Sequence, residues 1–169
     1  MSSTSPLFLI EGPSGSGKTT LATTLQQHLK THLGANIAML HLDDLYPGWG
    51  GLAQGSALAA ELIQQRAAGQ ALRWQRYHWV AGQPGQWQEL APEHPLIVEG
   101  CGALNATTAQ HAEVRIWLDA PAALRQQRAF SRGGEEYENH WTEWDEQYAE
   151  YVAAHRPRAF ANITRVATQ

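Results

Sequence analysis

Short apolar runs alternate with longer amphipathic segments along the chain, which predicts strands that alternate with helices. Residues 6–11 and 95–99 are apolar runs bounded by turn-forming residues, as expected for buried strands. Residues 37–42 and 114–119 predict two more strands, and residues 163–167 give a weaker signal for a last one. This order of elements favours an α/β fold with a parallel sheet covered by helices on both faces.

Helical periodicity marks four segments between these strands. The first has leucines four residues apart and ends at Gly34, and the second ends at Gly69. Residues 122–132 and 141–154 carry the other two, and we expect the polar residues 133–140 to separate them. Helices therefore follow most of the predicted strands, as a parallel sheet requires.

Composition narrows the classes of function. The 169 residues are 43% hydrophobic, which suits a single domain over residues 1–169. A formal net charge of −4 argues against a nucleic-acid polymer as partner. The apolar run near the N-terminus, Leu7 to Ile10, is too short for a signal peptide or a membrane span, and Cys101 is the one cysteine. We therefore expect a cytoplasmic protein without a membrane partner; the sequence leaves its oligomeric state open.

The most specific motif follows the first predicted strand and opens the first predicted helix. Two glycines separated by four residues precede Lys18 and Thr19, the pattern of a phosphate-binding loop. Glycines let backbone N–H groups approach phosphate oxygens, and the helix aims its positive end at the same anion. Lys18 can then bind the β- and γ-phosphates of ATP, and the Thr19 hydroxyl can bind Mg²⁺. The alternative is a Gly/Ser turn that binds no ligand. The predicted nucleotide-binding residues are Gly12, Pro13, Ser14, Gly15, Ser16, Gly17, Lys18, Thr19 and Thr20.

Paired aspartates follow the second predicted strand, at the sheet edge where parallel strands place their ligands. Asp43 could accept the proton of an acceptor hydroxyl, and Asp44 could hold Mg²⁺ or its waters. The two roles could also be exchanged, because adjacent side chains on an extended segment point to opposite sides. Paired Asp before Pro47 is otherwise ordinary turn chemistry, an alternative that the phosphate loop makes less favoured.

Two further segments offer groups for the metal and the phosphates. Glu99 ends a predicted strand, where it could orient a Mg²⁺-bound water or could be a solvated strand end. Arg125, Arg128 and Arg132 are spaced i, i+3 and i+7, which places them on one face of a helix. Such cations can hold phosphoryl oxygens as charge develops, although three arginines on a solvated face would also be ordinary.

Aromatic residues gather in the segment between the second and third core strands. Gly and Pro at residues 82–85 break this segment, so residues 73–87 predict a hairpin or an irregular excursion. Its tryptophans could form a platform for a planar acceptor, or could serve core packing or partner contact. They are Trp49, Trp74, Trp79 and Trp87, four of seven in the chain.

A second aromatic set lies near the C-terminus and has helical spacing. Its members are interpreted as a packed helix face rather than a ligand site: Trp141, Trp144, Tyr148 and Tyr151. His28 and His32 lie four residues apart on a helix but have no third ligand, so no zinc site is predicted.

Taken in order, these segments resemble the uridine kinase branch of the P-loop kinases, and most closely small bacterial uridine kinase-like proteins. The resemblance is carried by the phosphate loop, Asp43-Asp44-Leu45-Tyr46, Tyr77-His78-Trp79, Val98-Glu99-Gly100 and the arginine helix. It implies a three-layer αβα P-loop NTPase fold with a five-stranded parallel sheet in the order 2-3-1-4-5. It also implies an acceptor-binding excursion at about residues 45–90 and a short lid at about residues 125–140.

The resemblance implies roles for single residues as well. Asp43 corresponds to the base that activates the acceptor hydroxyl, and Lys18, Arg128 and Arg132 would act on the transferred phosphoryl group. The implied acceptor-binding residues are Asp43, Tyr46, Tyr77, His78 and Trp79, and the implied metal-binding residues are Thr19, Asp44 and Glu99. His78 stands where the family has an aspartate, and the chain is shorter than uridine kinases usually are.

Two functions from different classes follow from these observations. The first is a kinase that uses ATP and Mg²⁺ to phosphorylate a small acceptor, with a nucleoside such as uridine or cytidine among the candidates. The second is a nucleotide-dependent switch or a non-catalytic ATP-binding protein, in which Asp43 and the aromatic excursion bind a partner. The donor loop, the candidate base and the arginine helix favour the kinase.

Overall fold

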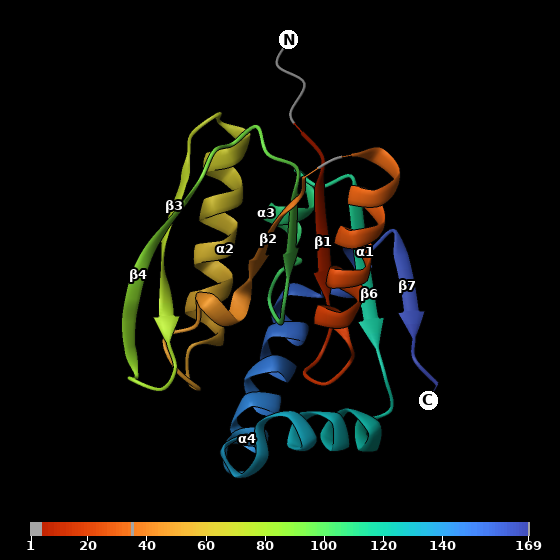
Figure 1. Ribbon diagram of the computed structural model, residues 1–169. Helices are drawn as coiled ribbons and strands as arrows, with labels where there is room; N and C mark the ends of the chain where they lie inside the picture. The colour runs from red at the N-terminus through yellow and green to blue at the C-terminus, as the bar shows by residue number, and fades with distance from the viewer. Residues whose placement is uncertain (1–4, 35, 169) are drawn as a thin grey trace.

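In the computed structural model, which describes residues 5–34 and 36–168, five strands form one parallel sheet (Figure 1). They lie in the order β2-β5-β1-β6-β7, which is 2-3-1-4-5 when only these strands are counted along the chain. The predicted fold and strand order are therefore confirmed. The bounds are β1 (Leu7–Glu11), β2 (Ala38–His41), β5 (Leu96–Glu99), β6 (Val114–Asp119) and β7 (Ile163–Val166).

Helices cover both faces of the sheet because its central strands are apolar on both sides. Along β1, Leu7 and Leu9 pack into the core on one face, and Ile10 packs into the core on the other. On the Ile10 face lies α1 (Lys18–Leu33), and on the Leu9 face lie α2 (Leu52–Ala67) and the later part of α4 (Ala122–His155). The remaining helical pieces are η1 (Leu42–Asp44), α3 (Ala106–Ala109) and η2 (Pro157–Phe160).

The predicted excursion contains α2 and a separate hairpin. After α2, the strands β3 (Leu72–His78) and β4 (Gln83–Leu90) pair antiparallel and form a two-stranded sheet of their own. Figure 1 shows this hairpin beside α2, at the edge of the molecule away from α1. Of the two alternatives for residues 73–87, the hairpin is the correct one.

Two helices meet within residues 133–140, as predicted, but the structure has no loop over these polar residues. They are helical, and α4 contains a single residue with non-helical dihedral angles, Gly134, at φ 58° and ψ −144°. The preceding Gly133 has no Cβ, so the ring of Tyr137 can pack against it; an added Cβ would meet that ring at 1.8 Å. The break is therefore confined to one residue, and the first part of α4 crosses below the carboxyl ends of β1 and β6 (Figure 1).

None of the helices among the described residues is both long enough and apolar enough to cross a membrane.

Candidate active site

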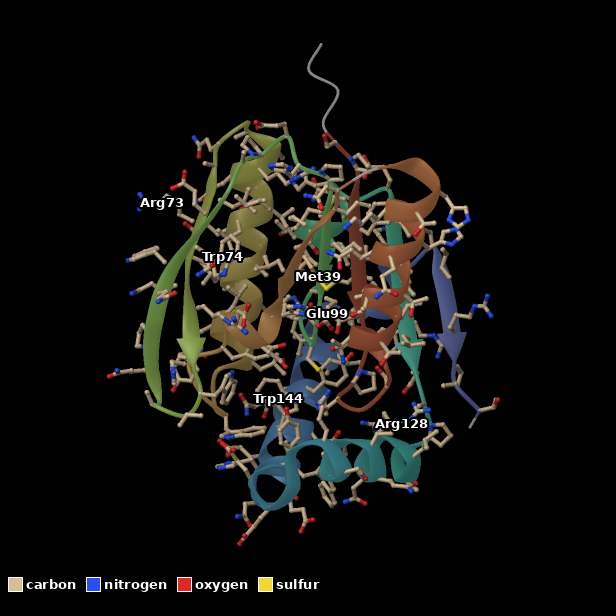
Figure 2. All side chains as sticks on the ribbon, in the orientation of Figure 1. Met39, Arg73, Trp74, Glu99, Arg128 and Trp144 are labelled. Atoms are coloured by element: carbon tan, nitrogen blue, oxygen red, sulfur yellow. The ribbon has the colours of Figure 1, made fainter. Side chains whose placement is uncertain are left out.

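A cleft of about 1010 Å³ opens at the carboxyl ends of the sheet strands. Figure 2 shows Glu99 at the end of β5, with Trp144 and Arg128 of α4 below it. The cleft brings together most of the residues predicted from the sequence. From the phosphate loop these are Ser14 through Thr20, and from elsewhere they are Asp43, Asp44, Tyr46, Tyr77, Trp79, Glu99, Arg128 and Arg132.

Three predicted residues are not among those that line the cleft. Gly12 and Pro13 are buried beneath the loop, where they support it. His78 is exposed on the hairpin, and its Nδ1 atom accepts a hydrogen bond from the amide of Ala81 at 3.0 Å. The family resemblance placed His78 with the acceptor, whereas in the structure its ring stabilises the hairpin turn.

The glycines of the phosphate loop are required by packing as well as by phosphate approach. A Cβ atom at Gly12 would lie 1.9 Å from the carbonyl oxygen of Leu118, and one at Gly15 would lie 2.2 Å from that of Arg125. Gly15 and Gly17 also have positive φ angles, 76° and 98°, which favour glycine. The loop is therefore held against β6 and α4 by its own backbone.

The loop leaves the start of α1 open to an anion. Gly17 precedes the helix without a side-chain cap, and the first turn has no acidic residue. The first amides of a helix lack intrahelical acceptors, and the helix dipole adds partial positive charge there. The Nζ atom of Lys18 bonds the carbonyl oxygen of Pro13 at 2.9 Å, and the buried Ser16 hydroxyl has no partner among the described residues. These features fit a polyphosphate chain.

Thr19, Glu99 and His41 form the candidate metal-binding part of the cleft. The Thr19 hydroxyl donates to Oε1 of Glu99 at 3.0 Å, and Nδ1 of His41 donates to the same oxygen at 2.6 Å. Burial would raise the pKa of Glu99, but the His41 hydrogen bond and the Lys18 charge outweigh it and lower that pKa. The hydrogen bond to Glu99 raises the pKa of His41. Glu99 is therefore ionised at neutral pH.

This part of the cleft suits Mg²⁺, which needs few protein ligands, rather than a metal ion coordinated only by protein side chains. Among residues 5–34 and 36–168, no group of three or more His, Cys, Asp or Glu side chains could hold a metal ion. Mg²⁺ commonly takes one or two protein oxygens and completes its octahedron with substrate phosphates and waters. Thr19 and Glu99 beside the phosphate loop supply that kind of partial site.

The two adjacent aspartates face different partners. Asp44 accepts a hydrogen bond from Nε of Arg76 on β3 at 2.8 Å. The Asp43 side chain opens into the cleft, yet the surrounding protein desolvates it and, together with the charge of Glu99, raises its pKa. The charges of Lys18 and Arg132 act on Asp43 in the opposite direction. Asp43 is thus the carboxylate next to the phosphate and metal groups, and Asp44 is engaged with the hairpin.

The three arginines of the predicted helix face separate into two groups. Arg128 lies next to the loop, since a Cβ atom at Gly17 would be 4.0 Å from its Nη1 atom, and Arg132 lies over the ring of Tyr137, 5.1 Å from its centroid. Both line the cleft. Arg125 instead bonds the carbonyl oxygen of Ser14 at 3.3 Å and pairs with Asp119 and Asp145, so it fastens α4 to the loop.

The end of the cleft away from the phosphate loop is aromatic. Trp49 lies at the middle of this group, stacked on His140 at 4.8 Å and edge-on to Trp79 at 5.2 Å. The indole of Trp79 donates to the backbone oxygen of Asp43 at 2.9 Å, which ties the hairpin to the candidate base. Tyr77, Tyr137 and Trp144 complete the aromatic lining.

Several residues of the site were not found by sequence reasoning. Trp144 belongs to the predicted packed helix face, and it is buried as expected, but it also lines the cleft. Three other residues belong to no motif, so only their positions could have identified them. His41 ends β2, Arg76 precedes Tyr77, and Tyr137 lies one helical turn after a glycine pair.

Comparison with known proteins identifies the family of this chain. Residues 9–153 match a family model described as an AAA domain. A curated relative, cytidylate kinase from Nitrosococcus oceani, is 31% identical over 137 residues that cover 78% of this chain and 55% of the relative. The chain thus spans about half the length of the curated relative it matches.

Solved structures resemble the whole fold. A possible uridine kinase from Bacillus stearothermophilus superposes with a TM-score of 0.67 at 20% identity, over 97% of this chain and 90% of that one. A proposed fructose transport system kinase from Silicibacter sp. TM1040 also gives a TM-score of 0.67 at 20% identity, over 96% and 90% of the two chains. At these identities the likeness is one of fold, and that fold is the kinase-like P-loop fold.

Proposed function

We propose that this chain, which belongs to the AAA domain family, is an ATP-dependent kinase that phosphorylates a hydroxyl group of a small acceptor. The observation that carries the proposal is the position of Asp43. Its carboxylate opens into the same cleft as the phosphate loop and feels the charges of Lys18, Glu99 and Arg132. A switch protein has no need of a base beside its phosphate loop, whereas a kinase needs one within reach of the acceptor.

Each group in the cleft has one task in this mechanism. Lys18 and the first amides of α1 would bind the phosphates, and Thr19 with Glu99 would hold Mg²⁺, which would supply charge neutralisation on the phosphoryl oxygens. Asp43, with its raised pKa, takes the proton of the acceptor hydroxyl as that oxygen attacks the γ-phosphorus. The bond from the γ-phosphorus to the β,γ-bridging oxygen breaks in the same step, and ADP leaves. Arg128 and Arg132 then stabilise the charge that develops on the transferred group.

The acceptor binds against the aromatic end of the cleft. Trp49, Tyr77 and Trp79 offer ring surface beside Asp43, and stacking on such rings is favourable by about 1–3 kcal/mol for a planar base. A nucleoside such as uridine or cytidine fits this chemistry, and the name of the structural neighbour from Bacillus stearothermophilus supports the choice. The chain would then be uridine kinase-like in activity as well as in fold.

A coupled assay of ADP release tests the proposal. The purified protein is given ATP and Mg²⁺ with each member of a panel of nucleosides, nucleotides, sugars and vitamin-like alcohols. A kinase releases ADP at least tenfold faster with its acceptor than without it, and mass spectrometry finds the phosphorylated product. ATP hydrolysis that no acceptor stimulates, but that a protein partner does, would instead favour the nucleotide-dependent switch.

A further inference from the structure

Glu11, the last residue of β1, has a carboxylate that is completely buried. It follows Leu7 and Leu9 on the same face of the strand, so it lies at the end of an apolar row. Burial raises the pKa of this carboxyl to about 7. A buried ionisable group destabilises a fold unless its hydrogen bonds are satisfied, so the partners of Glu11 indicate what it does.

All of these partners are hydrogen-bond donors from segments that form the cleft. Oε1 accepts from the amide of Gly12 at 2.9 Å, and both carboxylate oxygens accept from the amide of Gly102, at 3.1 and 3.0 Å. Oε2 also accepts from the amide of Leu104 at 2.9 Å. The hydroxyl of Tyr148, on α4, donates to Oε1 at 3.1 Å. Only a carboxylate accepts at both oxygens, so glutamine would place an NH₂ donor against a donor.

Gly12, the first residue of the phosphate loop, is held in place by contacts with Glu11, Cys101 and Leu118. Its amide bonds Glu11, and its carbonyl oxygen accepts from Sγ of Cys101 at 3.3 Å. Its Cα lies so close to the carbonyl oxygen of Leu118 that a Cβ atom would approach to 1.9 Å. Cys101 in turn lies 3.7 Å from Nζ of Lys18. The direction in which the phosphate loop leaves β1 therefore depends on Glu11.

The other contacts of Glu11 reach the opposite walls of the cleft. Gly102 and Leu104 belong to the loop that follows Glu99, and Tyr148 lies one helical turn after Trp144, which lines the cleft. One carboxylate thus joins the donor loop, the segment behind the candidate metal ligand and the later part of α4, which carries Trp144.

We propose that Glu11 is a positioning residue for nucleotide binding, which holds the start of the phosphate loop in register with the loop after Glu99 and with α4. Glu11 itself touches no ligand. This inference rests on the proposed function, because it takes ATP as the ligand whose phosphates occupy the loop. Loosening Glu11 widens the spacing between these segments, so ATP binding weakens even in protein that stays folded.

The test compares Glu11→Gln and Tyr148→Phe with a control variant, Tyr151→Phe. The Tyr151 hydroxyl, also on α4, donates to the carbonyl oxygen of Leu104 at 2.6 Å, so its removal deletes a buried hydrogen bond to the same loop and leaves the Glu11 carboxylate in contact with all its partners. Calorimetric titration with Mg-ATP below the melting temperature gives Kd for the folded protein. We expect Glu11→Gln to raise Kd about tenfold, Tyr148→Phe about threefold, and Tyr151→Phe less than twofold.

Thiol labelling measures the effect of Glu11 on the contact between Gly12 and Cys101 without a nucleotide. Cys101 is the one cysteine of the chain, so a thiol reagent reports its exposure directly. Glu11→Gln should increase the rate of Cys101 labelling at least tenfold, because the Gly12 peptide that holds the thiol is released, and Tyr151→Phe should not. Glu11→Gln with Kd within twofold of wild type, or Tyr151→Phe as impaired as Tyr148→Phe, overturns the inference. Wild type that binds no ATP overturns the proposed function instead, and if Glu11→Gln does not fold, Tyr148→Phe decides.

Discussion

The Nε atom of Arg76 lies 2.8 Å from Oδ1 of Asp44, and this ion pair fastens the hairpin to the end of the first turn after β2. The adjacent Asp43 points instead toward the phosphate loop, where Lys18 and Glu99 influence its pKa. A carboxylate paired with arginine is less available to an acceptor hydroxyl or a metal ion than one that is free. The Arg76–Asp44 pair thus divides the roles that the sequence leaves open between the two aspartates.

Asparagine substitutions at the two positions should therefore differ in effect. Asp43→Asn keeps the shape of the side chain but cannot take up a proton, so acceptor-stimulated turnover should fall by roughly 10²-fold or more with ATP affinity nearly unchanged. Asp44→Asn should reduce kcat by less than about threefold, since it removes an ion pair at the edge of the cleft. Measuring ADP release and Mg²⁺ dependence for both variants checks this, and equal losses would contradict the assignment.

Removal of the loop lysine should abolish activity without unfolding the protein. Lys18→Ala deletes the phosphate-loop cation beside the bridging and γ-phosphate oxygens, while the loop backbone stays packed against Leu118 and Arg125. Turnover should drop by at least 10³-fold, on the scale of other lost phosphate contacts. Lys30→Ala, an exposed position late in α1, is the control for a lost positive charge. A folded Lys18→Ala protein with near-normal turnover would contradict the proposed function.

The arginines of α4 should show two different kinetic patterns. Arg128→Ala and Arg132→Ala should lower kcat more than they raise KM for ATP, because contacts to the transferred group act chiefly in the transition state. Arg125→Ala should instead raise KM for ATP and lower the free energy of unfolding by about 1–3 kcal/mol, since it leaves the Ser14 carbonyl oxygen without its donor. If all three variants keep kcat within about twofold, the helix has no catalytic part.

The sequence predicts the sheet and the phosphate loop well because both follow from local patterns. β1 has two buried faces and so is apolar throughout, and the loop motif has a fixed spacing. Arg76 and Trp144 are different cases, because their place in the cleft depends on contacts more than 30 residues apart, such as the bond from Arg76 to Asp44. Glu11 could not be recognised for the same reason: apart from Gly12, its partners come from residues 102–148.

The break expected after Arg132 is present but is shorter than predicted, for a local reason that the sequence does contain. Two glycines are ordinarily helix-breaking, but only Gly134 adopts a non-helical conformation, and the glutamates that follow favour helix. Gly133 stays helical because Tyr137 occupies the space beside it. Predicting one kink rather than a loop would have required knowledge of that packing.

The kink at Gly134 should be needed for activity beyond its effect on stability. Its dihedral angles are closed to residues with a Cβ, so Gly134→Ala should cost about 1–3 kcal/mol and move Arg132 relative to Trp144. Gly69→Ala is the matched control: it also has a positive φ, 74°, and no atoms within 4 Å of its Cβ direction, but it ends α2 away from the cleft. Both variants should lose stability in thermal unfolding, and only Gly134→Ala should lose kcat, by about tenfold.

Stability should depend on pH through Glu11 in a direction opposite to that of most carboxyl groups. Burial raises the pKa of Glu11 from an ordinary 4.5 to about 7, so between these values the folded protein binds more protons than the unfolded chain. The free energy of unfolding then falls as pH rises through this window, by about 3 kcal/mol.

Urea unfolding of wild type and Glu11→Gln at several pH values between 4 and 8 isolates this contribution, because titrations common to both proteins cancel in the difference. Wild type should lose about 3 kcal/mol relative to Glu11→Gln as pH rises from 4.5 to 7, and little on either side of that window. A flat difference would mean that Glu11 titrates normally, and a rise with pH would mean that its ionised form is the more stable one. The expected fall means that the ionised carboxylate, which all its donors require, destabilises the fold at neutral pH. Such a loss is understandable where the group serves a binding site.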